Sequence, residues 1–272
     1  MPVSLFPRVV DALREPDPAR KVMLARALAA QWQAGELVLD DPAPVAPLGG
    51  PGRPHRPGLG SPHALERRTV PNRAGGAARL HPRAPHALNA INLAFDAAYR
   101  FRGMPREYYA DWLTVAAEEA QHFTLLRDHL ASLGHDYGDF AAHDGLWEMA
   151  VKTAHDALTR MALVPRVLEA RGLDASPALT RKLQSAGDHR AVEILGIIER
   201  DEIGHVRIGN RWYAHLCAER GLDPIATFRI LVCEFGAPRL RPPFHAAARR
   251  AAGFSDRELE LLEQLAAERQ AS

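Results

Sequence analysis

The 272-residue chain has little cysteine and no long apolar run. Its two cysteines, Cys217 and Cys233, are too few for a disulfide framework and lack the spacing of a cysteine metal motif. No apolar stretch is long enough to span a bilayer, and acidic residues interrupt the N-terminal segment too early for a signal peptide. These absences predict a soluble, cytoplasmic protein with no membrane partner.

A charge imbalance is also missing, since 34 basic residues stand against 33 acidic ones and the formal net charge is +1. Such a chain has no overall field that would attract nucleic acid or an anionic membrane. The composition, 47% hydrophobic and 25% charged, is that of an ordinary globular protein, and the length suffices for a sizeable core.

The alternation of β-branched and polar residues that is typical of strands is nearly absent, whereas apolar residues recur with the helical period. We therefore expect an all-α fold. Proline, glycine and arginine crowd the stretch "APLGGPGRPHRPGLGSP" and its surroundings, which predicts a long connecting arm. The expected organisation is an N-terminal helical segment (1–39), the arm (40–85), a four-helix bundle (86–236) and a C-terminal extension with one helix (237–272).

The bundle is expected to hold four long helices, joined as two hairpins by a longer crossover. Their predicted spans are about 86–101, 105–133, 146–171 and 190–220. Gly134, Gly172 and Gly221 mark the ends of the last three, because glycine favours the position after a helix. A short helix is predicted within Asp174–Gly187, and "SDRE" at Ser255–Glu258 has the capping-box pattern that begins a helix.

Two of the long helices carry the same motif, Glu119-Ala-Gln-His122 and Glu202-Ile-Gly-His205. A Glu and a His three positions apart project from one helix face, so that both can reach one metal ion. Each pair lies on an otherwise apolar stripe, where an unpaired charge would be costly and must be compensated. The helix between them adds a third carboxylate, Glu169, on its own apolar line. Two such motifs with additional carboxylates are the ligand pattern of di-iron and di-manganese helical bundles.

A single Glu-x-x-His motif is weak evidence, because such pairs also occur as exposed surface residues or as core histidines. A fourth carboxylate is expected on the first long helix, and it is missing. Glu169 precedes Glu202 by 33 positions, and the same distance before Glu119 lands on His86, beside Ala87. The only carboxylate of that helix is Asp96, more than two turns further along. Either His86 or Asp96 substitutes, or water fills the position, or the site is crippled.

The stretches "INLAFDAAYRF", "AAEEAQHF", "HDYGDFAAHDGLWEMA", "LVPRVLEARGLD" and "RDEIGHVRIGNRW" make the chain similar to a known superfamily. The sequence resembles the ferritin-like proteins, and among them an uncharacterised bacterial family related to tRNA-hydroxylating di-iron monooxygenases. The resemblance implies a ferritin-like four-helix bundle with two iron ions, or manganese instead. It implies five metal ligands, which are Glu119, His122, Glu169, Glu202 and His205. The family also has a His-x-Glu near the start of the first long helix, where this chain reads Pro85-His86-Ala87.

Three functions follow from these observations. The first is an oxygen-activating oxidoreductase that hydroxylates a small molecule or a modified nucleoside and receives electrons from a donor protein. The second is a ferroxidase that binds iron without an organic substrate. The third is a structural protein whose incomplete site has lost its metal. The arm could cover the site or grip a second subunit in a homodimer.

Overall fold

The computed structural model describes residues 3–40, 44–60, 77, 80–139, 142–235 and 240–271. Part of the predicted arm and the start of the predicted C-terminal extension lie outside these residues. The chain divides into two compact units, Met1–Glu148 and Met149–Ser272. Helices dominate both units, so the all-α prediction is confirmed. None of the described helices combines the length and the apolar character needed to cross a membrane.

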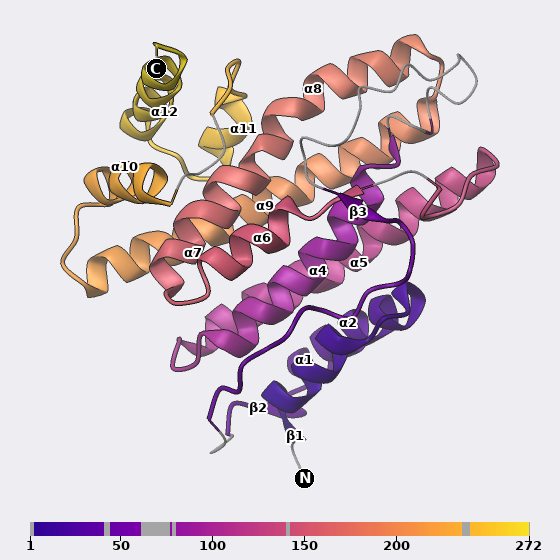
Figure 1. Ribbon diagram of the computed structural model, residues 1–272, viewed down its shortest axis with the longest axis horizontal. Helices are drawn as coiled ribbons and strands as arrows, with labels where there is room; N and C mark the ends of the chain where they lie inside the picture. Colours follow the sequence, from indigo (N-terminus) through magenta and orange to yellow (C-terminus); the bar gives the residue numbers. More distant parts are fainter. Residues whose placement is uncertain are drawn as a thin grey trace. The chain divides into compact units, whose positions relative to one another are not determined.

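The first unit is built from two helical hairpins (Figure 1). Its helices are α1 (Leu5–Arg14), α2 (Pro18–Gln33), α4 (Arg83–Arg100) and α5 (Arg106–Ser132). The helix α1 packs on α4 and α2 packs on α5, so the indigo hairpin covers the magenta one. Between α1 and α2, the Asp17 side chain accepts a hydrogen bond from the Arg20 amide at 2.8 Å, which caps α2 directly before Pro18.

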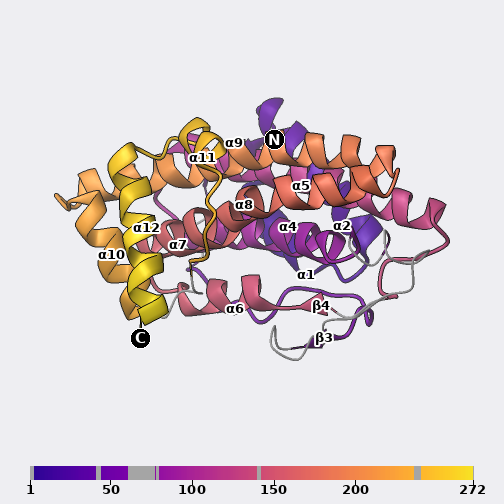
Figure 2. The same ribbon diagram turned by 90° about the horizontal axis from the view of Figure 1, so that it is seen from above.

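Two short parallel strand pairs attach loops to this unit. The strand β1 (Val3–Ser4) pairs with β2 (Leu37–Val38), which holds the chain before α1 against the chain after α2. The strand β3 (Leu59–Gly60) pairs with β4 (Ala142–His143), and Figure 2 shows these two side by side. The second pair attaches the arm at Leu59–Gly60 to the segment that follows α5.

The described part of the arm is anchored by buried polar contacts. The Lys21 ammonium donates to the Leu13 carbonyl at 3.0 Å, to the Gly52 carbonyl at 2.9 Å and to the Asn92 side chain. Gly52 lies so close to α1 that a Cβ there would be 2.0 Å from the Arg14 carbonyl oxygen, so only glycine is accommodated. The arm is therefore packed against α1, α2 and α4 at this point.

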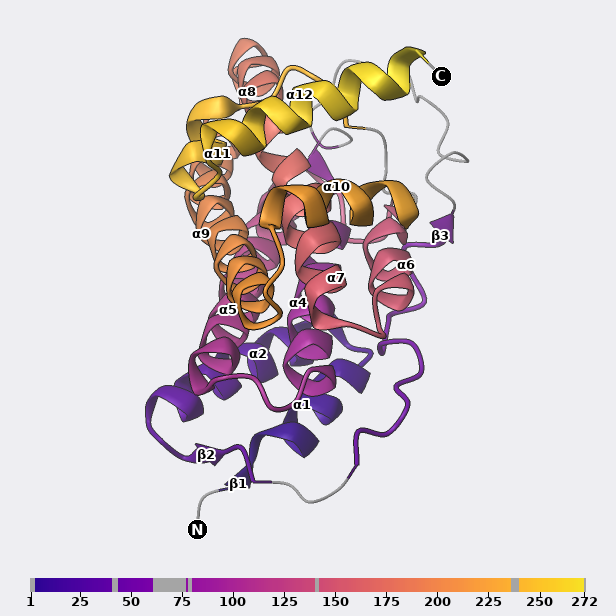
Figure 3. The ribbon, with the colours of Figure 1, turned by 90° about the vertical axis from the view of Figure 1, so that its left-hand side faces the viewer.

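The second unit centres on one long hairpin and its C-terminal cover. It contains α7 (Ala157–Leu163), the π-helical turn η1 (Val164–Glu169), α8 (Ala170–Ser185), α9 (His189–Glu219), α10 (Pro224–Glu234), α11 (Ala246–Ala251) and α12 (Asp256–Ala271). The division between the units falls within α6 (Gly145–Lys152). The continuous column of α7, η1 and α8 packs along α9. Figure 3 shows α11 next to α9, and α12 near α10.

The prediction of one helix over 146–171 followed by a separate short helix is wrong. The chain leaves the helical path after Lys152, and the Asp156 side chain starts a new helix by accepting from the Thr159 amide at 3.1 Å. Gly172 does not end a helix, because α8 continues to Ser185 with Pro177 inside it. The separate short helix expected after Gly172 is therefore part of α8. Packing of α8 along α9 outweighs the local signals at Gly172 and Pro177.

Other helix ends lie where the sequence predicts them. Gly134 and Gly221 follow α5 and α9 with φ of 79° and 65°, the left-handed conformation that glycine adopts freely. The capping box before α12 is also confirmed. The Glu258 carboxylate accepts from the Ser255 amide at 2.8 Å, and the Glu258 amide donates to the Ser255 hydroxyl at 3.3 Å. The prediction of a single C-terminal helix is wrong, because α11 precedes α12.

Candidate metal-binding site

The first Glu–His pair lies in the core of the first unit. Glu119 and His122 are only 2% and 1% exposed, and Val115 and Leu126 on the same stripe of α5 are buried as well. One Glu119 carboxylate oxygen lies 3.4 Å from His122 Nδ1. The i, i+3 spacing has thus placed an oxygen donor and a nitrogen donor together on the buried side of α5.

His86 on α4 lies within electrostatic reach of this pair. Burial lowers the pKa of His86 to about 4, although the negative charge of Glu119 opposes the shift. The neighbouring His122 contributes a small further lowering of the pKa. At neutral pH the His86 imidazole is therefore uncharged, which is the form that binds metals.

Asp96, the other candidate for the missing carboxylate, is already engaged in an ion pair. It is fully buried, and both of its oxygens accept from the Arg100 guanidinium, at 2.6 to 3.1 Å. Asp96 and Arg100 lie one turn apart on α4 and form an ion pair. These contacts favour His86 over Asp96 as the additional donor on α4. Ala87 is buried and offers no ligand atom.

The second Glu–His pair lies on α9 in the second unit. Glu202 and His205 are 5% and 1% exposed, and a Glu202 oxygen lies 3.8 Å from His205 Nδ1. Ile198 and Trp212, on the same stripe, are buried too. The two motifs therefore have matching local geometry, each in the core of its own unit.

Glu169 is brought to the level of the second pair by the packing of η1 on α9. Gly209 on α9 accommodates the Pro165 ring, since a Cβ at Gly209 would lie 2.3 Å from the Pro165 Cβ. The hairpin is antiparallel, so four residues beyond Pro165 correspond to four residues before Gly209. Those residues are Glu169, which is buried, and His205.

Among the described residues, Glu119 in the first unit and Glu202 and His205 in the second are buried and carry donor atoms that could hold a metal ion. Carboxylate oxygens and imidazole nitrogens together suit iron, manganese or zinc. Sequence reasoning did not foresee that Glu169 ends a π-helical turn rather than lying in a regular helix. Pro165, one turn before it, was the available signal, because proline inside a helix forces a local change of hydrogen bonding.

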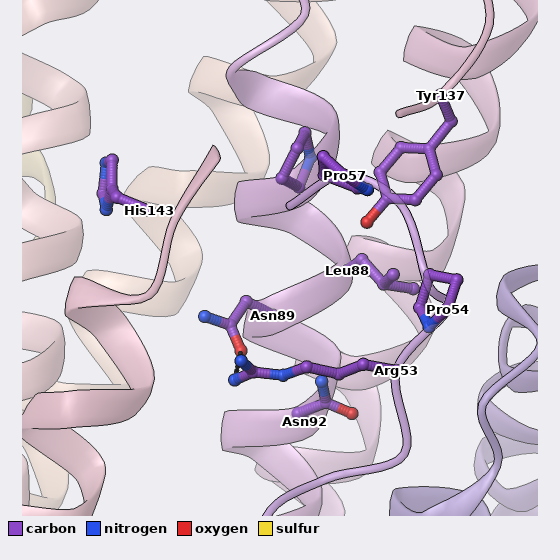
Figure 4. Close-up of a pocket in the computed structure, with 9 residues that line it drawn as sticks. Arg53, Pro54, Pro57, Leu88, Asn89, Asn92, Tyr137 and His143 are labelled. Atoms are coloured by element: carbon purple, nitrogen blue, oxygen red, sulfur yellow. Dashed lines mark hydrogen bonds between the residues drawn. The ribbon is translucent and has the colours of Figure 1, made fainter. Parts of the chain in front are cut away.

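A small cavity opens between the arm and α4 in the first unit (Figure 4). Its volume is about 30 Å³, and Pro85 and Leu88, which flank His86 and Ala87 in the sequence, are part of its lining. Arg53 reaches across it to the Asn89 side chain and forms a two-pronged pair with Asp144, with both N–O distances at 2.6 Å. A cavity of this size holds a molecule as small as water, not a nucleoside.

Comparison with known proteins gives a family but no activity. An uncharacterized protein of Haemophilus influenzae is 49% identical over 214 residues, which cover 76% of this chain and 74% of that protein. No solved structure matches the sequence. The model of the family described as "Protein of unknown function (DUF455)" matches residues 14–260. The chain therefore belongs to the DUF455 family.

Proposed function

We propose that this protein is a ferritin-like carboxylate protein that binds two iron or manganese ions and activates dioxygen to oxidise an organic substrate. The observation that carries the proposal is the matched pair of buried Glu-x-x-His motifs, on α5 and on α9. A chance surface motif would be solvated, whereas all four of these side chains are buried. The family match covers all of these residues but describes no function.

The donor set suits such ions. Glu119, Glu169 and Glu202 would supply anionic oxygens, and cations would balance their charge in the low-dielectric core. His122 and His205 would supply neutral nitrogen donors. Two iron ions bound by this set would supply the dioxygen chemistry, and the protein would supply the ligands and a dry surrounding.

His86 would take the place of the missing carboxylate on α4. Its uncharged imidazole lies near Glu119 and His122, while Asp96 is engaged by Arg100. Exchanging a carboxylate for an imidazole removes one negative charge from the centre. Such a centre would differ from an all-carboxylate site in metal affinity and in redox potential.

Metal content tests the proposal directly. We expect protein purified from iron-supplemented cells to hold about two metal ions per chain, as in other bundles of this ligand pattern. Glu119→Gln should lose most of the metal. Glu118→Gln is the matched control, because it makes the same change one position away, at a residue outside the Glu–His motif. Less than a few tenths of an equivalent of metal in the wild-type protein would favour the structural alternative, to which the alanine at position 87 also points.

Hydrogen exchange tests whether both motifs bind the same centre. If they do, metal should slow exchange around Glu119–His122 and around Glu202–His205, and Glu119→Gln should abolish the protection at both. Protection that persists around Glu202–His205 in this variant would show two separate mononuclear sites and would contradict the shared centre.

Oxygen consumption distinguishes the oxidase from a ferroxidase. The reduced protein is exposed to dioxygen with and without a mixture of nucleosides from hydrolysed tRNA, or with a small-molecule extract. Uptake that rises with one of these mixtures, with a product one oxygen atom heavier, would support the hydroxylase. Uptake that only accumulates ferric mineral would identify a ferroxidase.

A further inference from the structure

The π-helical turn η1 gives Glu169 an unusual support. Pro165 has no amide hydrogen to donate, and the Ala170 amide bonds back to the Pro165 carbonyl five residues earlier. A π-turn inserts an extra residue into a helix and so changes the direction in which the following side chains point. The direction of Glu169 therefore depends on what holds this turn in place.

Arg166, next to Pro165, is the main buried anchor of the turn. Its side chain is 2% exposed, and it donates to the Asn210 side chain at 2.7 Å and to the Glu258 carboxylate at 2.6 Å. The guanidinium carbon lies 4.4 to 4.9 Å from the ring centres of three aromatic residues, which are Tyr213, Phe228 and Phe254. The turn is thus fixed by groups from α9, from α10 and from residues 246–260, which we call the C-terminal segment.

Glu258 connects Arg166 to the start of α12. One of its oxygens closes the capping box with the Ser255 amide and hydroxyl, at 2.8 and 2.7 Å, and the other accepts from Arg166. Burial raises the pKa of Glu258, but the charge of Arg166 and the hydrogen bonds from Ser255 and Arg166 outweigh it and lower the pKa overall. The carboxylate is therefore ionised at neutral pH.

A second ion pair holds the chain on the other side of Glu169. Arg249 of α11 is fully buried and bonds to both oxygens of Asp174 on α8, at 3.0 and 2.6 Å. Arg166 precedes Glu169 by three residues and Asp174 follows it by five. The C-terminal segment therefore supplies one charged partner before Glu169 and one after it.

We propose that Arg166 and Glu258 are positioning residues for Glu169, so that the C-terminal segment sets the geometry of this metal ligand. The inference rests on the proposed function. If the buried guanidinium of Arg166 lost its carboxylate partner, its unpaired charge would strongly destabilise the fold. The turn η1 would then shift to bring Arg166 towards other partners or solvent. Supporting groups of this kind typically change metal affinity by about 10-fold to 100-fold when removed.

Coupling of this kind is reciprocal. Metal bound by Glu169 should stabilise the docked C-terminal segment, just as the docked segment favours metal binding. Hydrogen exchange at residues 246–260 of the full-length chain should therefore slow when Mn²⁺ is added.

The test is Glu258→Gln in the full-length chain, with Mn²⁺ as the probe. We expect its Mn²⁺ affinity, measured by electron paramagnetic resonance, to fall by about 10-fold or more. Ser255→Ala is one control, because it weakens the cap of α12 but keeps the Glu258 carboxylate. Glu268→Gln is another, because it breaks the exposed Arg229–Glu268 pair between α10 and α12 without touching η1. Both controls should stay within about 2-fold of wild type, since neither removes the charge that pairs with Arg166.

Four outcomes separate the inference from the proposed function. An Mn²⁺ affinity of Glu258→Gln equal to wild type would overturn the inference. Glu258→Asp, which keeps the charge, should restore affinity, and a failure to do so would also count against it. A wild-type chain that binds no metal would refute the proposed function. Exchange at residues 164–171 would then test the pair alone, and an unchanged rate in Glu258→Gln would overturn it.

Discussion

Charged or ionisable side chains on and near α4 are compensated in three different ways. Lys21 donates to two carbonyls and one amide oxygen, Asp96 is paired with Arg100, and His86 is uncharged. A full set of acceptors, a counter-ion and loss of the proton are the alternatives to an unpaired buried charge. Each kind of compensation leads to a different prediction about the residue concerned.

His86→Gln and Asp96→Asn should change different properties of the protein, the first its metal affinity and the second its stability. His86→Gln removes a proposed ligand, so metal affinity should fall by about 10-fold or more while the metal-free protein stays folded. Asp96→Asn leaves Arg100 with a weaker partner, so the free energy of unfolding should fall by about 1–3 kcal/mol with the metal content unchanged. Metal analysis and urea denaturation measure the two effects. Loss of metal in Asp96→Asn alone would make Asp96 the ligand.

Lys21 should make stability depend on pH. Burial, and then the charge of Arg53, lower its pKa from 10.5 to about 7, although Glu15 opposes the shift. Between these values the unfolded chain keeps a proton that the folded chain releases. The free energy of unfolding should therefore rise from about pH 7 towards pH 10, by at most about 1.4 kcal/mol per pH unit, and should show no Lys21 contribution to the slope below pH 7.

Lys21→Met isolates this contribution. Urea denaturation of both proteins in the metal-free state, from pH 6 to 9.5, should show a difference between them that changes with pH only above about 7. Lys182→Met, at an exposed site on α8, is the matched control. Parallel pH profiles for wild type and Lys21→Met would contradict the prediction.

At the scale of elements, η1 and α9 fit together because Gly209 on α9 has no side chain. Gly209 leaves the space that the Pro165 ring fills, and this contact fixes the level at which the column of α7, η1 and α8 meets α9. Gly196 lies on the same helix with no atom near its Cβ position. The effect of the same substitution can therefore be compared at a glycine with a close neighbour and at one without.

Gly209→Ala should lower the free energy of unfolding by about 1–3 kcal/mol, because the added methyl group would overlap Pro165 and force η1 or α9 to move. Gly196→Ala should instead raise it by about 0.5–1 kcal/mol, because alanine is the better helix former where nothing is displaced. Thermal or urea denaturation of both variants checks this. A neutral Gly209→Ala would mean that the contact with Pro165 is loose.

The elements that the sequence predicts well are those whose limits are set locally. Glycines at positions 134 and 221 and the Ser255–Glu258 capping box act within one turn of chain, and all three agree with the structure. The prediction of one helix over 146–171 missed the local cap at Asp156, whereas the continuation past Gly172 depends on packing along α9 and has no local signal. Gly172 and Pro177 look like stop signals only when the packing along α9 is unknown.

At the scale of the whole molecule, the pairing of Glu119 with His122 and of Glu202 with His205 could be predicted, because each pair lies within one helix turn. The choice between His86 and Asp96 could not, since it depends on how α4 meets α5. The partnership of Arg166 with Glu258 joins residues 92 positions apart and has no sequence pattern at all. Long-range contacts of this kind require the fold.

The two oxygens of Glu258 have separate tasks, and this restricts how the position can vary over evolution. Glutamine serves in capping boxes as well as glutamate does, so a helix cap alone would let the two interchange. Here the side chain must also be negatively charged, because its second oxygen forms an ion pair with Arg166. Homologues that replace the acid at this position should therefore have replaced the arginine as well, whereas the serine that begins the cap is free to change alone.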